Sequence, residues 1–426
     1  MTYQETLDFL FEQLPMYQRI GRKAFKKDLS NTIELSRLLD DPQEKYPSIH
    51  IAGTNGKGTV AHALSSILQE AGYSTGLYTS PHLKSYRERI RMNGQMVTED
   101  FVTNFVKNLQ QDITKIQPSF FEITVAMAFS YFAHMKADIA VIETGLGGRL
   151  DSTNIIKPTL SIITSIGLDH QDMLGETLEL IAKEKAGIIK EETPVVIGQL
   201  PPEAQTVMVS RAQELKCKLN CDAELWKIEE QHQGVYVGYK SEQLIYEAIL
   251  SEIKGNYFKK NLPTIFESCH ELNQRGFTLS TENILNGLAR VVSNTGLKGR
   301  WQKLDESPLM ICDIGHNQDG IAETMNNLPG YSYNQLHIVF GTVNDKNLDQ
   351  IFPLLIKNAI YYFCQAKVPR AMKATILQNE AAKHGLHGDV FDSVNSAIHS
   401  AKLNAGPKDL IFIGGSTFVV AEIEDL

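Results

Sequence analysis

The stretch "IHIAGTNGKGTVAHAL", residues 49–64, joins a short apolar run to a helical pattern through a loop rich in glycine. After the loop, apolar residues recur at helical spacing from Val60 to Ala71, and the pattern stops at Gly72. This order predicts a strand, a glycine turn and an amphipathic helix. The loop amides and the positive end of such a helix point to one place, which suits a phosphate group.

The sequence of this loop differs from the common phosphate-binding motif G-x-x-x-x-G-K-[ST]. Only two residues separate Gly53 from Gly56, and Gly58 stands between Lys57 and Thr59. Lys57 would supply a point charge to the outer phosphates, and Thr59 a hydroxyl to a bound metal. The alternative is a glycine-rich turn with an incidental lysine. The predicted nucleotide cradle comprises Gly53, Thr54, Asn55, Gly56, Lys57, Gly58 and Thr59.

Strand and helix patterns alternate beyond the loop. Strands are expected in "YSTGLYTS" (73–80), "ADIAVIETG" (137–145), "TLSIITSIG" (159–167) and "TPVVIG" (193–198). Helices are expected in "TVAMAFSYFAHM" (124–135) and "LELIAKEKAGII" (178–189). Buried apolar strands that alternate with helices predict an α/β protein with a mostly parallel, helix-covered sheet.

The pattern changes in the later part of the chain. Residues 235–250 alternate like a small antiparallel ribbon, and helical segments follow at about 261–275 and 281–293. The turn-rich "SNTGLKGR" (293–300) marks a domain boundary, with a P-loop ATPase-like domain over 1–295 and a Rossmann-like domain over 299–426. The second domain has strand patterns at 309–315, 336–342, 359–366 and 409–416.

Composition and charge exclude several classes of protein. The chain of 426 residues is 42% hydrophobic and 21% charged, which are globular values. Its net charge of −9 and the absence of a long basic run argue against a nucleic-acid binder. The N-terminal "MTYQETLDFLFEQLP" resembles neither a signal peptide nor a membrane span, so we expect a cytoplasmic protein. The five scattered cysteines are expected to be free thiols.

Two further strand ends carry residues suited to a ligand. Glu143 ends one predicted strand, and Asp169 and His170 follow another. Ligands of open α/β sheets collect at the carboxyl ends of the strands. A carboxylate such as that of Glu143 is a hard oxygen donor for Mg²⁺. His170 alone is more often a packed or surface histidine than a metal ligand.

Eight motifs together resemble one family. They are "HIAGTNGKGT", "TSPHL", "ERIRMNG", "ETGLGGRLDSTN", "TSIGLDHQDMLG", "KEKAGIIK", "GRW" and "DIGHN". In this order they resemble the folylpolyglutamate synthase and dihydrofolate synthase family, whose loop carries the extra glycine after lysine. The chain departs from the family's usual pattern at Phe258 in "GNYFKKN" and at Gln318 in "GHNQ".

The resemblance implies an ATP-dependent ligase. ATP phosphorylates a carboxylate of dihydropteroate or of a folate, and the amine of L-glutamate attacks the acyl phosphate. We expect one chain to perform both reactions; a folate-extending enzyme only, a ligase for another acid and an ATP-dependent binding or switch protein are the alternatives. The family's pattern implies the use of two Mg²⁺ ions. We expect a monomer, and the charge and the N-terminal sequence predict no nucleic-acid or membrane partner.

Residue roles follow from the same resemblance. Lys57 and the loop amides hold the phosphates, Thr59 and Glu143 bind one Mg²⁺, and His170 helps with the second. Lys185 matches a lysine that becomes carbamylated; without the family match it would be a charge on a solvated helix face. Asn261, Arg300 and Asp313 are expected at the nucleotide, and His316 at the nucleotide and glutamate side. The expected substrate contacts are Ser80, His82, Ser119, Phe121, Asp151 and Ser416, of which Phe121 could instead be simple core.

Overall fold

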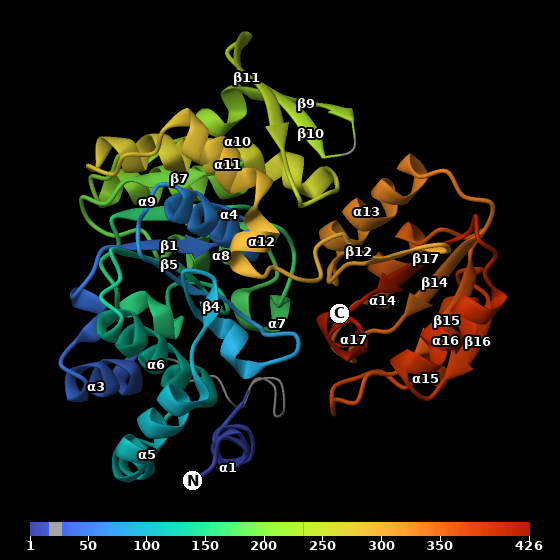
Figure 1. Ribbon diagram of the computed structural model, residues 1–426, viewed down its shortest axis with the longest axis horizontal. Helices are drawn as coiled ribbons and strands as arrows, with labels where there is room; N and C mark the ends of the chain where they lie inside the picture. Colours follow the sequence, from blue (N-terminus) through green and yellow to red (C-terminus); the bar gives the residue numbers. More distant parts are fainter. Residues whose placement is uncertain (17–27, 233) are drawn as a thin grey trace. The chain divides into compact units, whose positions relative to one another are not determined.

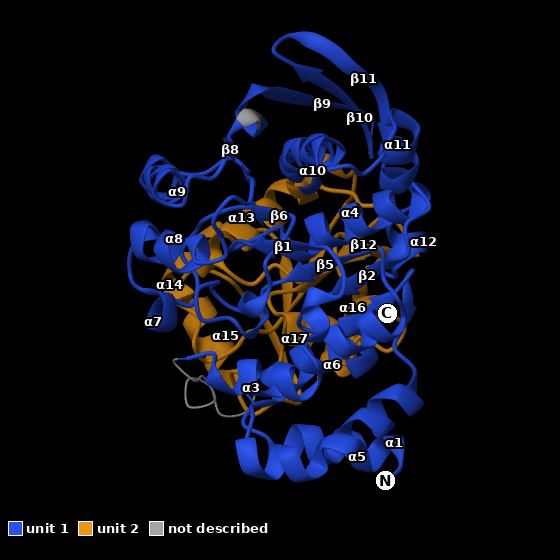
Figure 2. Cartoon of the chain, turned by 90° about the vertical axis from the view of Figure 1, so that its left-hand side faces the viewer, with its two compact units in different colours: residues 1–252, 258–296 blue, residues 253–257, 297–426 orange. Residues whose placement is uncertain are grey.

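The computed structural model describes residues 1–16, 28–232 and 234–426, and these form two compact units. Unit 1 contains residues 1–252 and 258–296, and unit 2 contains residues 253–257 and 297–426 (Figure 2). The chain therefore enters unit 2 briefly before it returns to complete unit 1. None of the described helices combines the length and apolar character needed to cross a membrane.

Unit 1 is built on an eight-stranded sheet of order β4-β3-β2-β5-β1-β6-β7-β8. All neighbours pair in parallel except β3 with β2 and β4 with β3. The strands are β1 (Ser48–Ala52), β2 (Thr75–Tyr78), β3 (Ile90–Met92), β4 (Gln95–Met96), β5 (Ile139–Glu143), β6 (Leu160–Ile163), β7 (Val195–Ile197) and β8 (Leu219–Asn220). The prediction of a mostly parallel sheet is confirmed, with β1 at its centre (Figure 1).

Helices surround this sheet. They are α1 (Tyr3–Asp8), α3 (Ser30–Leu38), α4 (Lys57–Glu70), α5 (Glu99–Ile116), α6 (Phe120–His134), α7 (Gln171–Leu174), α8 (Leu178–Ala186), α9 (Pro202–Glu214), α11 (Thr281–Ala289) and α12 (Val291–Thr295). Helix α10 (Asn256–Gln274) begins in the unit 2 segment and continues through unit 1. Helix α4 packs against β1, β2 and β5 and also against α11 and α12. It is therefore buried along residues 58–68, where the sequence predicted an amphipathic helix.

A three-stranded antiparallel ribbon, β9 (Trp226–His232), β10 (Val235–Lys240) and β11 (Gln243–Leu250), extends unit 1 (Figure 1). The predicted ribbon over residues 235–250 is confirmed. Strand β9 was missed because "WKIEEQH" lacks apolar alternation. The buried Glu267 of α10 anchors the ribbon: it accepts hydrogen bonds from Trp226 Nε1 (2.7 Å) and Lys240 Nζ (2.6 Å).

Unit 2 is a six-stranded sheet of order β12-β13-β17-β14-β15-β16, parallel except for β12. Its strands are β12 (Gln302–Glu306), β13 (Leu309–Cys312), β14 (Leu336–Phe340), β15 (Ile360–Cys364), β16 (Gly388–Phe391) and β17 (Leu410–Gly414). Its helices are α13 (Gln318–Asn327), α14 (Leu348–Ile351), α15 (Ala374–Ala382), α16 (Val394–Asn404) and α17 (Thr417–Glu422). Phe340, Phe363 and Phe412 lie in a separate apolar core.

Candidate active site

The glycine loop lies where the sequence predicted it, between β1 and the first residue of α4. Gly56 adopts φ +85°, and a Cβ there would collide with Asn261 Oδ1. A Cβ on Gly53 would collide with Thr164 Oγ1. Glycine is required at both positions because side chains of unit 1 close around the loop. Asn261, predicted at the nucleotide, therefore lies directly against the loop.

The segment after β6 holds the loop in shape. The amide of Thr54 donates to Ser165 O (2.8 Å), and the amide of Asn55 donates to Ser165 Oγ (2.9 Å). Thr164 Oγ1 donates to Asn55 O at 2.6 Å. These two amides are used within the protein, so the helix start from Lys57 onward is the part suited to phosphate. Sequence reasoning did not single out Thr164 and Ser165, although hydroxyl residues directly after a strand were a signal for them.

Two lysines converge on one carbonyl of the loop. Lys57 Nζ donates to Gly53 O (2.9 Å) and to Thr54 O (3.2 Å), and Lys185 Nζ donates to Gly53 O (2.8 Å). Lys185 is only 4% exposed, so the alternative of a solvated helix face is wrong. Burial, and then the nearby Lys57 charge, hold the pKa of the Lys185 amine well below its usual value.

Glu143 ends β5 beside the loop. It pairs in register with Ile51 of β1, and its Oε2 accepts a hydrogen bond from the Ser80 amide at 3.0 Å. Its side chain is buried, as is that of Thr59 in the first turn of α4. A carboxylate and a hydroxyl beside a phosphate loop form an oxygen donor set that fits Mg²⁺. The "TSPHL" segment is tied to this group through the backbone of Ser80.

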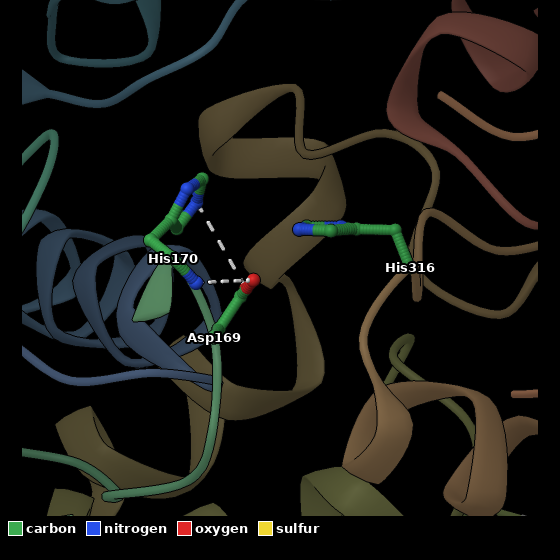
Figure 3. A group of neighbouring side chains, drawn as sticks. All are labelled: Asp169, His170 and His316. Carbon is green, nitrogen blue, oxygen red and sulfur yellow. Dashed lines mark hydrogen bonds and ion pairs between the residues drawn. The ribbon is translucent and has the colours of Figure 1, made fainter. Parts of the chain in front are cut away.

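Asp169 and His170 follow β6 and precede α7, and Figure 3 shows the two side chains next to each other. The His170 amide donates to Asp169 Oδ1 (2.9 Å), and His170 Nε2 lies 3.9 Å from Asp169 Oδ2. His170 has φ +49°, and the neighbouring carboxylate stabilises this turn. Within unit 2, His316 Nδ1 lies 3.0 Å from Ile314 O. A carbonyl only accepts, so Nδ1 carries the proton and Nε2 is the unprotonated nitrogen when the ring is neutral.

The predicted pterin residues surround the loop after β5. Asp151 Oδ2 accepts from the amides of Gly145 (2.9 Å) and Leu146 (2.8 Å), and Oδ1 accepts from the amide (3.0 Å) and hydroxyl (2.5 Å) of Thr153. Burial raises the pKa of Asp151, and the Thr153 hydroxyl bond is the largest opposing cause. The carboxylate thus organises its own loop; a contact with substrate stays a prediction.

Phe121 and Ser119 lie at the start of α6. Phe121 is partly buried, its ring covers Gly145, and its centroid lies 6.2 Å from that of Tyr78. Ser119 is the N-cap residue of α6, whose Oγ accepts from the Glu122 amide at 3.2 Å. The Ser119 side chain therefore has a structural role, whereas Phe121 is neither fully buried nor remote from the loop of Asp151.

His82 belongs to an aromatic cluster next to this region. Its Nδ1 accepts from Arg89 Nε at 2.7 Å, and burial, with the Arg89 charge, holds the pKa of His82 well below its usual value. The Arg89 guanidinium lies 5.2 Å from the centroid of Phe120. The ring of Phe11 lies 5.4 Å from that of Phe120 and 6.0 Å from that of His82. Sequence reasoning missed Arg89, although this residue stands in the quoted "ERIRMNG" motif.

Two predicted residues of unit 2, Asp313 and Ser416, follow strands of its sheet. Asp313 follows β13 and accepts from the amides of Trp301 (2.8 Å) and Gly315 (2.8 Å). Burial raises the pKa of Asp313, and the charge of Arg300 opposes this shift. Ser416 is the N-cap residue of α17, and its Oγ accepts from the Phe418 amide at 3.1 Å. Asp313 and Ser416 thus lie just beyond the carboxyl ends of the neighbouring strands β13 and β17.

The two departures from the family's pattern have plain structural roles. Phe258 is fully buried, and its ring centroid lies 6.0 Å from that of Tyr236 in the ribbon. Gln318 is the first residue of α13, which Asn317 caps by accepting from the Gly320 amide at 2.8 Å. One departure therefore contributes to the core and the other begins a helix.

Two family models match the chain. The Mur ligase middle domain matches residues 51–262, and the Mur ligase glutamate ligase domain matches residues 299–417. The dihydrofolate synthase/folylpolyglutamate synthase of Bacillus subtilis is 34% identical over 423 residues, which cover 95% of this chain and 96% of that protein. The protein of the same name from Escherichia coli is 32% identical, with 88% of this chain and 85% of that protein covered.

Solved structures agree with these matches. Escherichia coli FolC in complex with DHPP and ADP superposes with a TM-score of 0.86 at 28% identity, covering 99% of this chain and 97% of that chain. A bifunctional folylpolyglutamate synthase/dihydrofolate synthase from Yersinia pestis, complexed with AMPPNP and a Mn ion, gives a TM-score of 0.84 at 28% identity, with the same coverage. The nucleotide loop and oxygen donors of this chain fit such ligands. The chain is therefore an ATP-using ligase that forms carbon–nitrogen bonds, and it belongs to the folylpolyglutamate synthase and dihydrofolate synthase family of Mur ligases.

Proposed function

We propose that this chain joins L-glutamate to dihydropteroate and, in a second reaction, to a reduced folate, with ATP as the energy source. The observation that carries the proposal is the glycine loop between β1 and α4, with Lys57 and Lys185 both bonded to Gly53 O. The bifunctional relatives support the choice of substrates. Both reactions have the same chemistry and can therefore share one nucleotide site.

A carboxylate is a poor electrophile and must be activated. We infer that Lys57 and the start of α4 bind the phosphates of ATP and orient the γ-phosphoryl group toward the substrate carboxylate. Transfer of that group forms an acyl phosphate and ADP. The glutamate amine then attacks the acyl carbon, the amide bond forms, and phosphate leaves. Lys57 stabilises the negative charge on the transferring group throughout.

Glu143 and Thr59 would hold one Mg²⁺, and His170 with a carbamylated Lys185 would hold a second. Bound magnesium supplies positive charge that neutralises the phosphates. Carbamylation needs an uncharged amine, and burial lowers the pKa of the Lys185 amine, which favours that form. The carbamate would replace a buried cation with an anionic oxygen donor. Asn261, Arg300 and Asp313 are proposed at the nucleotide, His316 at the nucleotide and glutamate side, and Ser416 at the glutamate.

The experiment is an ADP-release assay with dihydropteroate, dihydrofolate, tetrahydrofolates and muramyl precursors as acids, each with and without glutamate. We expect release that requires both a pterin acid and glutamate. ATP hydrolysis without either substrate would favour the binding or switch protein. Turnover of folates but not of dihydropteroate would leave a folate-extending enzyme only, and turnover of muramyl precursors alone would contradict the proposal.

The Asp151→Ala variant separates the two pterin substrates in the same assay. We expect this variant to lose dihydropteroate turnover more severely than tetrahydrofolate turnover. Asp151 holds Gly145 in place beneath the ring of Phe121, which is the residue proposed to contact the pterin of dihydropteroate. Equal losses for both substrates would show that this loop does not distinguish them.

A further inference from the structure

His50 lies in the middle of β1 and is completely buried. Its Nε2 lies 2.8 Å from Thr153 Oγ1, and its Nδ1 has no hydrogen-bond partner among the described residues. Burial, and then the charge of Lys190, lower the pKa of His50 to about 3, so the ring is neutral at physiological pH. Neither the phosphate loop nor the substrate contacts proposed above account for this buried histidine.

The hydrogen-bond chain from His50 has only one direction. Thr153 Oγ1 lies 2.5 Å from Asp151 Oδ1, and both oxygens of this carboxylate already accept from backbone amides, so the carboxylate acts as an acceptor. The single hydroxyl proton of Thr153 therefore points to Asp151. The lone pairs of the same oxygen face His50, so the imidazole must donate through Nε2–H. Its Nδ1 then carries no proton, which agrees with the lack of an acceptor for it among the described residues.

The other end of the chain of hydrogen bonds is the loop after β5. Asp151 Oδ2 accepts from the amides of Gly145 and Leu146, so the carboxylate closes this loop. Phe121 packs over Gly145, and a side chain there would collide with its ring. His50 thus connects β1, which leads three residues later to Gly53, with the loop that carries the proposed pterin contacts.

We propose that His50, as the neutral Nε2–H tautomer, is a positioning residue for the pterin substrate: through Thr153 it fixes the Asp151 carboxylate and the loop that follows Glu143. The assignment of substrate rests on the function proposed above. His50 does not touch the reacting atoms. Its removal changes how the pterin acid binds and leaves the nucleotide loop in place, because Thr54 and Asn55 are held by Ser165.

The test compares His50→Leu with His50→Gln, and Thr153→Val with Thr153→Ser. Glutamine can offer an N–H near the position of the imidazole Nε2, and serine keeps the hydroxyl. We expect Thr153→Val, which removes a hydrogen bond to a charged carboxylate, to raise the KM for dihydropteroate roughly tenfold to hundredfold. We expect His50→Leu, which removes a hydrogen bond between neutral groups, to raise this KM roughly threefold to tenfold. The KM for ATP stays within about twofold, the allowance for sites that do not couple. His50→Gln and Thr153→Ser restore most of the pterin affinity.

His337→Leu is the matched control. His337 is also buried in a strand and bonds a hydroxyl, Tyr362 OH at 2.9 Å, but it belongs to unit 2. We expect it to lower thermal stability without changing the KM for the pterin acid. Equal KM values for wild type and the His50→Leu and Thr153→Val variants, or equal increases for ATP and pterin, would overturn the proposal.

A spectroscopic measurement on the wild type does not depend on any variant folding as an active enzyme. In ¹⁵N-histidine NMR spectra, with His50→Gln used for assignment, His50 should be the Nε2–H tautomer with no titration between about pH 5 and 8, the range in which an unperturbed histidine titrates. An Nδ1–H tautomer, or a titrating ring, would overturn the proposed direction of the hydrogen bonds. A wild type that turns over no pterin acid would instead refute the proposed function and its pterin assignment, while the tautomer still decides whether the chain of hydrogen bonds exists.

Discussion

Lys57 combines a flexible charge with a fixed position at the first residue of α4. We predict that Lys57→Ala folds normally and lowers kcat by about 10²-fold or more, because a preorganised charge at a phosphoryl-transfer site is lost. Steady-state ADP release, with the thermal midpoint as a fold check, measures the effect. Lys183→Ala is the control, since Lys183 is exposed and forms an ion pair with Glu179 within helix α8. Near-normal turnover by Lys57→Ala would show that the loop lysine does not take part in phosphoryl transfer.

The second prediction concerns the modification of Lys185, whose amine is buried. Intact mass in bicarbonate buffer should show the addition of one CO₂ to the wild type and to Lys183→Ala, and none to Lys185→Ala. Lys185→Ala should be inactive and partly rescued by small carboxylates. An active wild type that carries no CO₂ would contradict the modification.

The pH dependence of stability follows from the same residue in CO₂-free buffer. The folded-state pKa of Lys185 is depressed, so the unfolded chain binds more protons between that pKa and the unfolded value of about 10.4. The free energy of unfolding should therefore rise with pH across this interval. Lys185→Met should weaken this rise and be more stable than wild type at neutral pH, as measured by urea unfolding. A steeper rise in Lys185→Met would contradict the burial of a neutral amine.

At the scale of elements, two glycines with similar φ angles allow a matched comparison. Gly56 has φ +85° and faces Asn261 Oδ1, whereas Gly72 has φ +88° with no atom within 4 Å of the place that a Cβ would occupy. Both alanine variants should lose about 1–2 kcal/mol to the left-handed backbone. Only Gly56→Ala should also raise the KM for ATP, because it displaces Asn261. Equal KM values in the two variants would show that the loop tolerates a side chain.

The contact between the ribbon and α10 depends on Glu267. This carboxylate is 1% exposed and accepts from Trp226, Lys240 and Asn220. Glu267→Ala leaves those donors without their acceptor and should lower the free energy of unfolding by about 3 kcal/mol or more. Glu282→Ala, in the exposed first turn of α11, should change it by less than about 0.5 kcal/mol. Urea unfolding of both variants measures the difference, and equal effects would contradict the anchoring role.

At the scale of the whole molecule, the reactivity of the five free thiols measures how well the core of each unit excludes solvent. Cys269 is buried in unit 1, and Cys312 and Cys364 are buried in unit 2. Burial raises the pKa of Cys269 to about 12 and raises those of the other two as well. Cys217 and Cys221 are partly exposed.

We therefore predict that a thiol reagent modifies Cys217 and Cys221 first in the native protein and all five cysteines in denaturant. Peptide mapping of the labelled protein identifies the sites. Early modification of Cys312 or Cys364 would show that the unit 2 core opens under native conditions. Slow modification of Cys217 and Cys221 would instead show that the surface around β8 is covered.

Local pattern was sufficient for the order of strand, loop and helix around residues 49–64, for most parallel strands and for the ribbon over 235–250. These features rest on apolar spacing and glycine punctuation, which are properties of neighbouring residues. Strand β9 was missed because its residues lack apolar alternation; its tryptophan is held instead by the buried Glu267, in a helix further along the sequence. The sequence predicted that helix α4 has one exposed face. In the structure α11 and α12 cover that face, and the residues of α4 alone give no sign of this contact.

The sequence by itself determined the glycine loop between a strand and a helix, the place of Glu143 at a strand end and, through its motifs, the family. Only the tertiary structure decided which side chains meet: Lys185 with Gly53, Asn261 with Gly56, and His50 with the Asp151 loop. These partners are far apart in the chain, and their contacts exist only after β1, β5 and β6 pair side by side. Burial follows from that pairing, and burial is the main cause that lowers the pKa of the Lys185 amine and of the His50 ring.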